Sequence, residues 1–180
     1  MTLHSPMFRT SLIAFAANAL LWTLQSQLNH YVSLWQMSVF VGGLAVAFAG
    51  LRLGYRDGAR ALILTGLWFD AAAPVPLGTH VFLFLLAQTV IFSFRDRLAR
   101  EEPLVGITIA AVANLLLFVA LSATLLHRNP APMQLAGRLI ADSLISFCTV
   151  VVVAGWYFGF VEQLLEIAGV SLRRDQRSIV

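Results

Sequence analysis

Long runs of apolar residues fill almost the whole chain, and short polar segments separate the runs. A helix that crosses a membrane needs about 20 apolar residues, because the hydrocarbon core of a bilayer is about 30 Å thick. The runs therefore predict an all-α integral membrane protein whose six transmembrane helices form one bundle. The predicted spans are residues 10–28, 31–53, 57–73, 77–94, 104–126 and 135–160.

The composition agrees with this interpretation. Of the 180 residues, 59% are hydrophobic and only 12% are charged, whereas soluble domains carry about 25% charged residues. The mean hydropathy is +0.81. Because the connecting segments are short, we expect a single polytopic membrane domain over residues 1–180, with a cytoplasmic tail at 161–180. The net charge of +3 does not indicate nucleic-acid binding, because most basic residues lie at the ends of apolar runs.

Arginine supplies every basic side chain, and its distribution predicts the orientation of the chain. With six spans, Arg128 and Arg138 lie on one side of the membrane and the other arginines lie on the opposite side. Basic residues accumulate on the cytoplasmic side of membrane proteins. Both termini are therefore expected in the cytoplasm. The arginines on that side are Arg9, Arg52, Arg56, Arg60, Arg95, Arg97, Arg100, Arg173, Arg174 and Arg177.

The third apolar run is too short to span a membrane by itself. Residues 61–73 would extend roughly 20 Å as a helix, against about 30 Å of hydrocarbon. A helix that starts near Tyr55 would be nearly long enough if the side chains of Arg56 and Arg60 extend toward the interface. A re-entrant segment is the alternative.

A carboxylate and a broken backbone mark the connection between the third and fourth runs. Asp70 lies inside the apolar run, and the sequence Pro76-Leu77-Gly78 follows it. An ionised carboxylate is costly in hydrocarbon, so Asp70 should have a partner and should face protein or water. Two interpretations follow: a site that binds a partner or a solute, and hydrogen bonds that cap the end of a neighbouring helix.

Small residues recur four positions apart, so that each pair lies on one helical face. Such faces let helices pack closely in lipid. The pairs expected to pack against other helices are Gly43 with Ala47, Gly50 with Gly54, and Gly155 with Gly159.

Other polar side chains inside the predicted spans favour structural contacts. Arg138 and Asp142 are four residues apart, and this spacing predicts an ion pair on one helical face. Asn18, Gln88 and Asn114 belong to three different spans and predict interhelical hydrogen bonds, each worth roughly 0.5–2 kcal/mol. A polar pathway lined by all three amides is the alternative.

No pattern typical of catalysis or metal binding stands out in the sequence. The four histidines are scattered, and none lies four residues from another metal ligand on a helix. No glycine-rich phosphate loop and no nucleophile elbow is present. We therefore expect a protein that is not an enzyme and that holds neither a metal nor a cofactor.

The sequence resembles the bacterial rod-shape-determining protein MreD family. Six spans in a chain of this length, with both ends inside, agree with that family, and so does a central Gly-x-x-x-Asp followed by Pro-Leu-Gly. The next span ends in a basic cluster, as family members tend to do. The matching residues are Gly66, Asp70, Pro76, Leu77 and Gly78, followed by Arg95, Arg97 and Arg100.

This resemblance implies a function without catalysis. A member of the family would be an inner-membrane scaffold of the cell-elongation machinery, which maintains rod shape and synthesises peptidoglycan. It would bind the single-span partner MreC and act indirectly with the MreB filament, RodA and penicillin-binding protein 2. The resemblance also implies a fold similar to the six-helix substrate-binding subunits, or S components, of energy-coupling-factor vitamin transporters.

That fold supplies an alternative function, the capture of a small vitamin-like solute for a transporter. Such a subunit would enclose a pocket near the outer face, lined by aromatic residues and a few polar groups. Trp35, Trp68, Asp70 and His80 are the residues expected to line it. The first predicted span lacks the clean stripe of small residues with which such subunits dock to their transporter.

Overall fold

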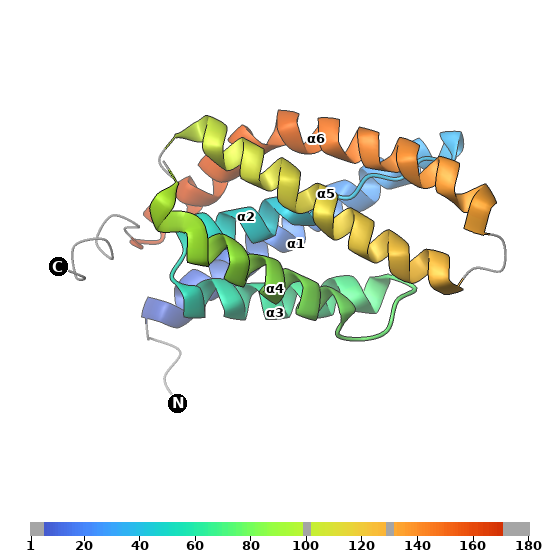
Figure 1. Ribbon diagram of the computed structural model, residues 1–180. Helices are drawn as coiled ribbons and strands as arrows, with labels where there is room; N and C mark the ends of the chain where they lie inside the picture. The colour runs from blue at the N-terminus through green and yellow to red at the C-terminus, as the bar shows by residue number, and fades with distance from the viewer. Residues whose placement is uncertain (1–5, 99–101, 129–131, 171–180) are drawn as a thin grey trace.

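The computed structural model describes residues 6–98, 102–128 and 132–170. Within these residues the chain forms six α-helices in one bundle and contains no strand (Figure 1). The prediction of an all-α chain with six helices is therefore confirmed. The helices are α1 (Pro6–Val32), α2 (Gly42–Arg52), α3 (Tyr55–Ala72), α4 (Thr79–Phe94), α5 (Pro103–Arg128) and α6 (Pro132–Ile167), and the 3₁₀ turns are η1 (Ser33–Trp35) and η2 (Arg95–Arg97).

Two of the helices are long and apolar enough to cross a membrane, judged by length and composition. These segments are Pro103–Leu126 of α5 and Gly137–Ile167 of α6. Helix α3 begins at Tyr55 and has 18 residues, so it is about 27 Å long. The third apolar run thus lies in a helix that starts at Tyr55, which is the longer helix considered in the sequence analysis, and not in a helix of residues 61–73 alone.

Helix α2 lies at the centre of the bundle and packs against α3, α4, α5 and α6. Its residues 42–51 are all buried. Glycine allows this close approach: a Cβ atom at Gly43 would lie 2.4 Å from the backbone nitrogen of Asn114 in α5, and one at Gly50 would lie 2.7 Å from Cγ2 of Ile91 in α4. Ala47, between the two glycines, is fully buried.

The other glycines of the predicted pairs have open surroundings in the described chain. No atom lies within 4 Å of a Cβ position at Gly159, and the nearest atom at Gly155 is Cδ1 of Ile107, 4.0 Å away. At Gly54 the nearest atom is Oδ2 of Asp57, 3.9 Å away. Of the predicted pairs, close helix packing therefore occurs at Gly43 and Gly50 of α2, whereas Gly155 and Gly159 of α6 are exposed.

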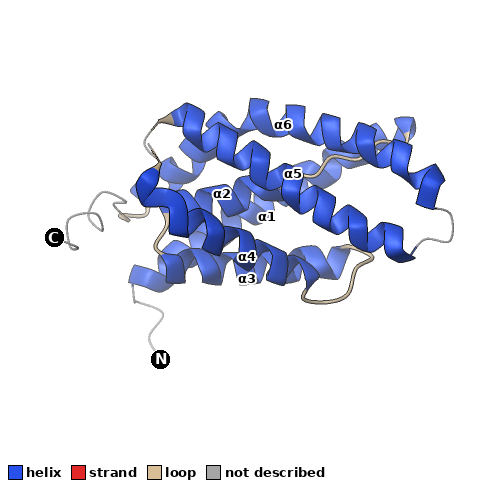
Figure 2. Cartoon of the chain, in the orientation of Figure 1, coloured by secondary structure: helices blue, strands red, loops and turns tan. Residues whose placement is uncertain are grey.

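The second predicted span is wrong as one continuous helix over residues 31–53. Helix α1 continues to Val32, η1 follows, and an extended segment at residues 37–41 separates η1 from α2 (Figure 2). Helix α2 has only 11 residues and is about 16 Å long. The apolar pattern hid this break because the groups that stabilise it are polar side chains of other helices.

The two ends of the bundle differ in their charged contacts. The start of α1, the end of α6 and the junction between α2 and α3 lie at one end (Figure 1). There Arg9 Nη2 donates to the Ala168 carbonyl at 3.2 Å, and Arg52 Nε pairs with Glu162 Oε1 at 3.1 Å. The connection between α3 and α4 lies at the opposite end. Arg100, Arg173, Arg174, Arg177 and the predicted tail beyond residue 170 lie outside the described residues.

Replacement of Gly43 by alanine should destabilise the bundle by roughly 1–3 kcal/mol, because the new methyl group would overlap the backbone of α5. Thermal unfolding of the purified protein in detergent measures this change. Gly159→Ala is the matched control: its site is open, and alanine inside a helix gains up to about 1 kcal/mol over glycine. Equal melting temperatures for the two variants would contradict the packing described for α2.

Candidate functional site

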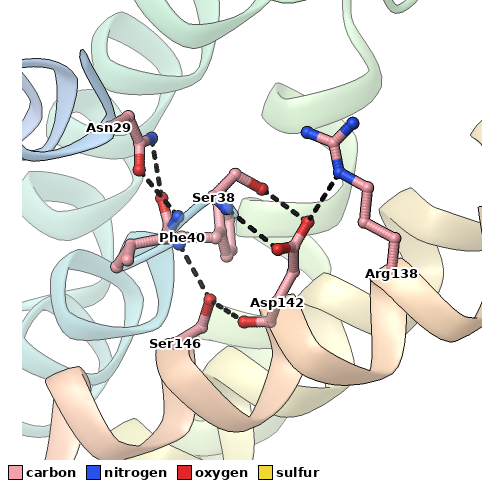
Figure 3. A network of polar contacts seen from close by, with 7 residues as sticks. Asn29, Ser38, Phe40, Arg138, Asp142 and Ser146 are labelled. Atoms are coloured by element: carbon pink, nitrogen blue, oxygen red, sulfur yellow. Dashed lines mark hydrogen bonds and ion pairs between the residues drawn. The ribbon is translucent and has the colours of Figure 1, made fainter. Parts of the chain in front are cut away.

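In the extended segment at residues 37–41, the N–H groups of residues 38–41 make no hydrogen bond to the backbone. The segment follows Gln36, whose φ of 57° ends η1 in a left-handed conformation. Unpaired backbone groups are costly in an apolar interior, so each needs a partner. Side chains of α1, α5 and α6 supply these partners, and Figure 3 shows the contacts from α1 and α6.

Asn29 and Asp142 hold the segment from opposite sides (Figure 3). Asn29 of α1 accepts a hydrogen bond from the Val39 N–H at 2.7 Å and donates to the Val39 carbonyl at 2.9 Å. Asp142 of α6 accepts from the Ser38 N–H at 2.9 Å and from the Ser38 hydroxyl at 2.8 Å. The two side chains thus bind the backbone as a neighbouring strand would.

Three further side chains complete this network. Ser146 Oγ accepts from the Phe40 N–H at 3.0 Å, and Gln25 Oε1 accepts from the Val41 N–H at 3.3 Å. Asn114 of α5 donates to the Phe40 carbonyl at 2.8 Å and accepts from the N–H at the start of α2, that of Gly43, at 3.0 Å. Every backbone N–H from residue 38 to residue 41 therefore has a side-chain acceptor.

The pair of Arg138 and Asp142 has a smaller part in this network than the sequence spacing suggested. Arg138 Nε lies 3.8 Å from Asp142 Oδ2, and the arginine side chain is 50% exposed. An exposed ion pair contributes about 0–1 kcal/mol. The main partner of the buried Asp142 carboxylate is Ser38, which the sequence pattern did not single out.

Asp70 caps the first turn of α4. Its Oδ2 accepts from the Gly78 N–H at 2.7 Å, and its Oδ1 accepts from the His80 N–H at 2.9 Å. Oδ1 also lies 2.8 Å from Nδ1 of the His80 ring. The first N–H groups of a helix lack helical partners and favour a negative charge. Of the two interpretations of Asp70, this geometry agrees with the one in which its carboxylate caps the end of a neighbouring helix.

The other residues of the Gly66–Gly78 motif shape the same connection. Gly78 has a φ of 93°, which glycine adopts without steric cost. A Cβ atom at Gly66 would lie 2.7 Å from Cα of Val81, so glycine lets α3 and α4 approach closely. Pro76 accepts from the N–H and the hydroxyl of Thr79. Leu77 projects outward and is 78% exposed.

A cavity of about 390 Å³ lies between the extended segment and this connection. Of the residues expected to line a solute pocket, His80 borders the cavity, whereas Trp35, Trp68 and Asp70 do not. The described residues that line it are Trp22, Gln25, Ser26, Asn29, Ser38, Val39, Phe40, Phe69, Ala72, Ala73, Pro74, Val75, His80, Phe118, Leu121, Ser122, Leu125 and Leu139. Its wall is therefore mostly apolar and aromatic.

The three amides inside the spans form separate contacts. Asn18 donates to Thr65 Oγ1 at 2.9 Å and accepts from the Tyr157 hydroxyl, which joins α1, α3 and α6. Gln88 of α4 donates to the Tyr55 carbonyl of α3 at 3.1 Å. With the Asn114 contacts, these bonds confirm the predicted interhelical hydrogen bonds.

Sequence reasoning missed the side chains that build the network and the cavity. No pattern used in the sequence analysis singled out Gln25, Asn29, Ser38, Ser146 or Trp22. One pattern was available: Ser146 is four residues from Asp142, so both lie on one face of α6. That pattern does not reveal their partner, because the extended segment is distant in sequence.

Asp142→Ala should leave the two donors of Ser38 without an acceptor, at a cost of about 1–3 kcal/mol. We expect amide hydrogen exchange at residues 38–41 to accelerate by roughly tenfold or more, since 1.4 kcal/mol corresponds to a factor of about ten. Arg138→Ala is the matched control, and it should change exchange there by less than about fivefold because the ion pair is exposed. Faster exchange in the control than in Asp142→Ala would contradict this assignment.

Comparisons with protein-family models, with curated proteins and with solved structures give no significant match to this chain. The resemblance to the MreD family therefore rests on the predicted topology and on the residues of the motif. Those residues build the connection between α3 and α4.

Proposed function

We propose that this chain is a multi-pass protein of the bacterial inner membrane with both termini in the cytoplasm. The observation that carries the proposal is the distribution of polarity in the bundle. Polar side chains are buried, and large apolar side chains are exposed along several helices. In lipid, apolar side chains can face outward at no cost, whereas polar groups must pair with one another inside.

Buried polar residues occur on all the helices of the described chain except α2. Helix α4 illustrates the opposite surface: Phe82, Leu86, Val90 and Phe94 recur every four residues and are each half exposed or more. A contiguous apolar face of this kind on a soluble monomer would mark an interaction site or an aggregation risk. The buried polar residues are Thr10, Ser11, Asn18, Thr65, Asp70, His80, Gln88, Asn114, Ser122, Asp142 and Ser146.

The arginine distribution supports the proposed orientation. Arg9, Arg52, Arg56, Arg60 and Arg95 lie on segments that meet at the end of the bundle where the described chain begins and ends. Arg138 lies near the start of α6, at the other end. The first group would face the cytoplasm under the positive-inside rule.

We further propose that the protein acts as a scaffold of the cell-elongation machinery, as the resemblance to MreD implies, with no catalytic role. The supporting observation is the motif itself, since Gly66, Asp70 and Gly78 together fix the connection between α3 and α4. This connection presents Leu77 outward and begins the helix whose exposed apolar stripe starts at Phe82. A fold similar to that of S components belongs to the same proposal.

The stripe of Phe82, Leu86, Val90 and Phe94, here called the α4 stripe, is the surface proposed to hold the single membrane helix of an MreC-like partner. Without a hydrophobic driving force in lipid, helices associate through close packing. The α4 stripe supplies a row of side chains at the spacing into which a second helix packs. Contact with the MreB filament, RodA and penicillin-binding protein 2 would then be indirect.

Co-purification tests the scaffold proposal. The tagged protein, extracted from its native membrane with a mild detergent, should recover a single-span protein together with cell-wall synthases. Leu86→Trp places a bulky ring on the α4 stripe and should reduce that recovery severalfold. Leu116→Trp is the matched control, because Leu116 is equally apolar and exposed but belongs to α5.

Equal recovery with both variants would contradict docking on the α4 stripe. Recovery of a paired-ATPase module with a small molecule would contradict the scaffold proposal as a whole.

Cysteine labelling tests the proposed topology. In a Cys148→Ala background, Arg56→Cys and Arg97→Cys should resist a membrane-impermeant thiol reagent in intact cells and react after permeabilisation. Leu77→Cys is the control for the opposite side and should react in intact cells, because Leu77 is exposed at the other end of the bundle. All three wild-type positions are exposed in the bundle, so burial would not explain a lack of reaction. Labelling at position 56 or 97 in intact cells would overturn the orientation.

Substrate capture for an energy-coupling-factor transporter is the second candidate function, and the cavity is the observation that favours it. Its volume of about 390 Å³ falls within the range of roughly 300–1,000 Å³ that is typical of small-molecule sites. The cavity lies at the end of the bundle opposite Arg9, Arg52 and Arg95, where a solute from outside would enter.

A further inference from the structure

The residues that line the cavity determine which class of ligand it can bind. None of the described residues that line it is Asp, Glu, Lys or Arg. A charged molecule would therefore lose its hydration without gaining a counter-ion, which is costly. The wall favours a neutral, mostly apolar molecule that packs against the rings of Trp22, Phe40, Phe69 and Phe118.

Three of the six polar side chains on the wall already have partners in the network, whereas the hydroxyls of Ser26 and Ser122 have none among the described residues. Gln25, Asn29 and Ser38 are bonded within the network that holds the extended segment. These groups have a structural role that a ligand would have to disrupt. His80 differs from them, because one of its ring nitrogens has no partner.

His80 is only 4% exposed, and its ring is held firmly. The rings of Phe69 and Phe84 lie 5.5 Å and 5.7 Å from it, centroid to centroid. Nδ1 lies 2.8 Å from Asp70 Oδ1. That carboxylate also accepts two backbone N–H bonds, so Asp70 acts as an acceptor and Nδ1 carries the proton.

The other nitrogen, Nε2, has no hydrogen-bond partner among the described residues. Nε2 also keeps some accessible surface, so it is not fully enclosed. The cavity is the open space that His80 borders. When the proton is on Nδ1 and the ring is neutral, Nε2 is a hydrogen-bond acceptor.

We propose that the cavity binds a small neutral amphiphile whose hydroxyl or amide N–H donates a hydrogen bond to Nε2 of His80. The apolar part of the molecule packs against the four aromatic rings of the wall. Asp70 has a second role in this site: it caps α4, and it also holds the imidazole in the tautomer that accepts. This inference goes beyond the scaffold proposal and supplies a ligand class for the second candidate function.

Photo-crosslinking with a diazirine-bearing octanol tests the site in the full-length protein purified in detergent. Peptide mapping should place crosslinks on the cavity wall, in residues 22–29 and 72–80. A diazirine-bearing octane lacks the donor, and a diazirine-bearing octanoate carries a charge, so both should label these peptides less. Labelling confined to the outer apolar faces, or equal labelling of the wall by all three probes, would overturn the proposal.

His80→Phe keeps an aromatic ring but removes the acceptor, and it should lower octanol labelling of the wall by roughly three- to tenfold, as expected for one hydrogen bond. His30→Phe is the matched control, since His30 is exposed on α1, and it should label like the wild type. Ser26→Trp keeps His80 and places a large ring at an exposed residue of the wall, so it should also reduce labelling. Unchanged labelling in both His80→Phe and Ser26→Trp would contradict the assigned site.

A competition arm identifies the source of the ligand. Diacylglycerol, a neutral lipid with one hydroxyl, should compete with the octanol probe if the natural ligand comes from the bilayer. Lack of competition would indicate a smaller, water-borne alcohol or amide at the same site. Partner recovery tests the α4 stripe, whereas crosslinking tests the cavity. Failure of crosslinking would therefore not contradict the scaffold proposal, and failure of partner recovery would not contradict ligand binding in the cavity.

Discussion

The need to pair backbone N–H groups within an apolar bundle governs this structure. Two segments interrupt the helices, the extended stretch at residues 37–41 and the connection from Asp70 to Gly78. In both, side chains of other elements replace the missing helical hydrogen bonds: Asn29 and Asp142 bind the first segment, and Asp70 binds the second. In an apolar interior, non-helical backbone persists only where protein groups satisfy it.

The two interruptions also explain where the cavity lies. Because the extended stretch takes the place of a helical segment, α2 is only 11 residues long and does not fill the end of the bundle opposite the termini. The last turn of α3 and its connection to α4 form the other wall. The polar groups that satisfy each interruption surround the cavity, and His80 is the point at which one of these networks meets the open space.

The structure separates two kinds of surface that the proposals use. The α4 stripe faces outward and carries only apolar side chains, which suits a helix-packing partner. The cavity faces inward and combines aromatic rings with an available acceptor on His80 and the hydroxyls of Ser26 and Ser122, which suits a small neutral molecule. Asp70 contributes to both, since it fixes the start of α4 and orients the His80 ring.

The sequence by itself determined the helical class, the number of helices and the segregation of arginines, because these depend on local composition and spacing. The spacing of small residues did not separate the packed Gly43 and Gly50 from the open Gly54, Gly155 and Gly159. The tertiary structure alone decided where the second predicted span breaks and where the cavity lies. The physical reason is the distance along the chain between partners. Ser38 and Asp142 are 104 residues apart, and no local pattern of apolar and polar positions records that they meet.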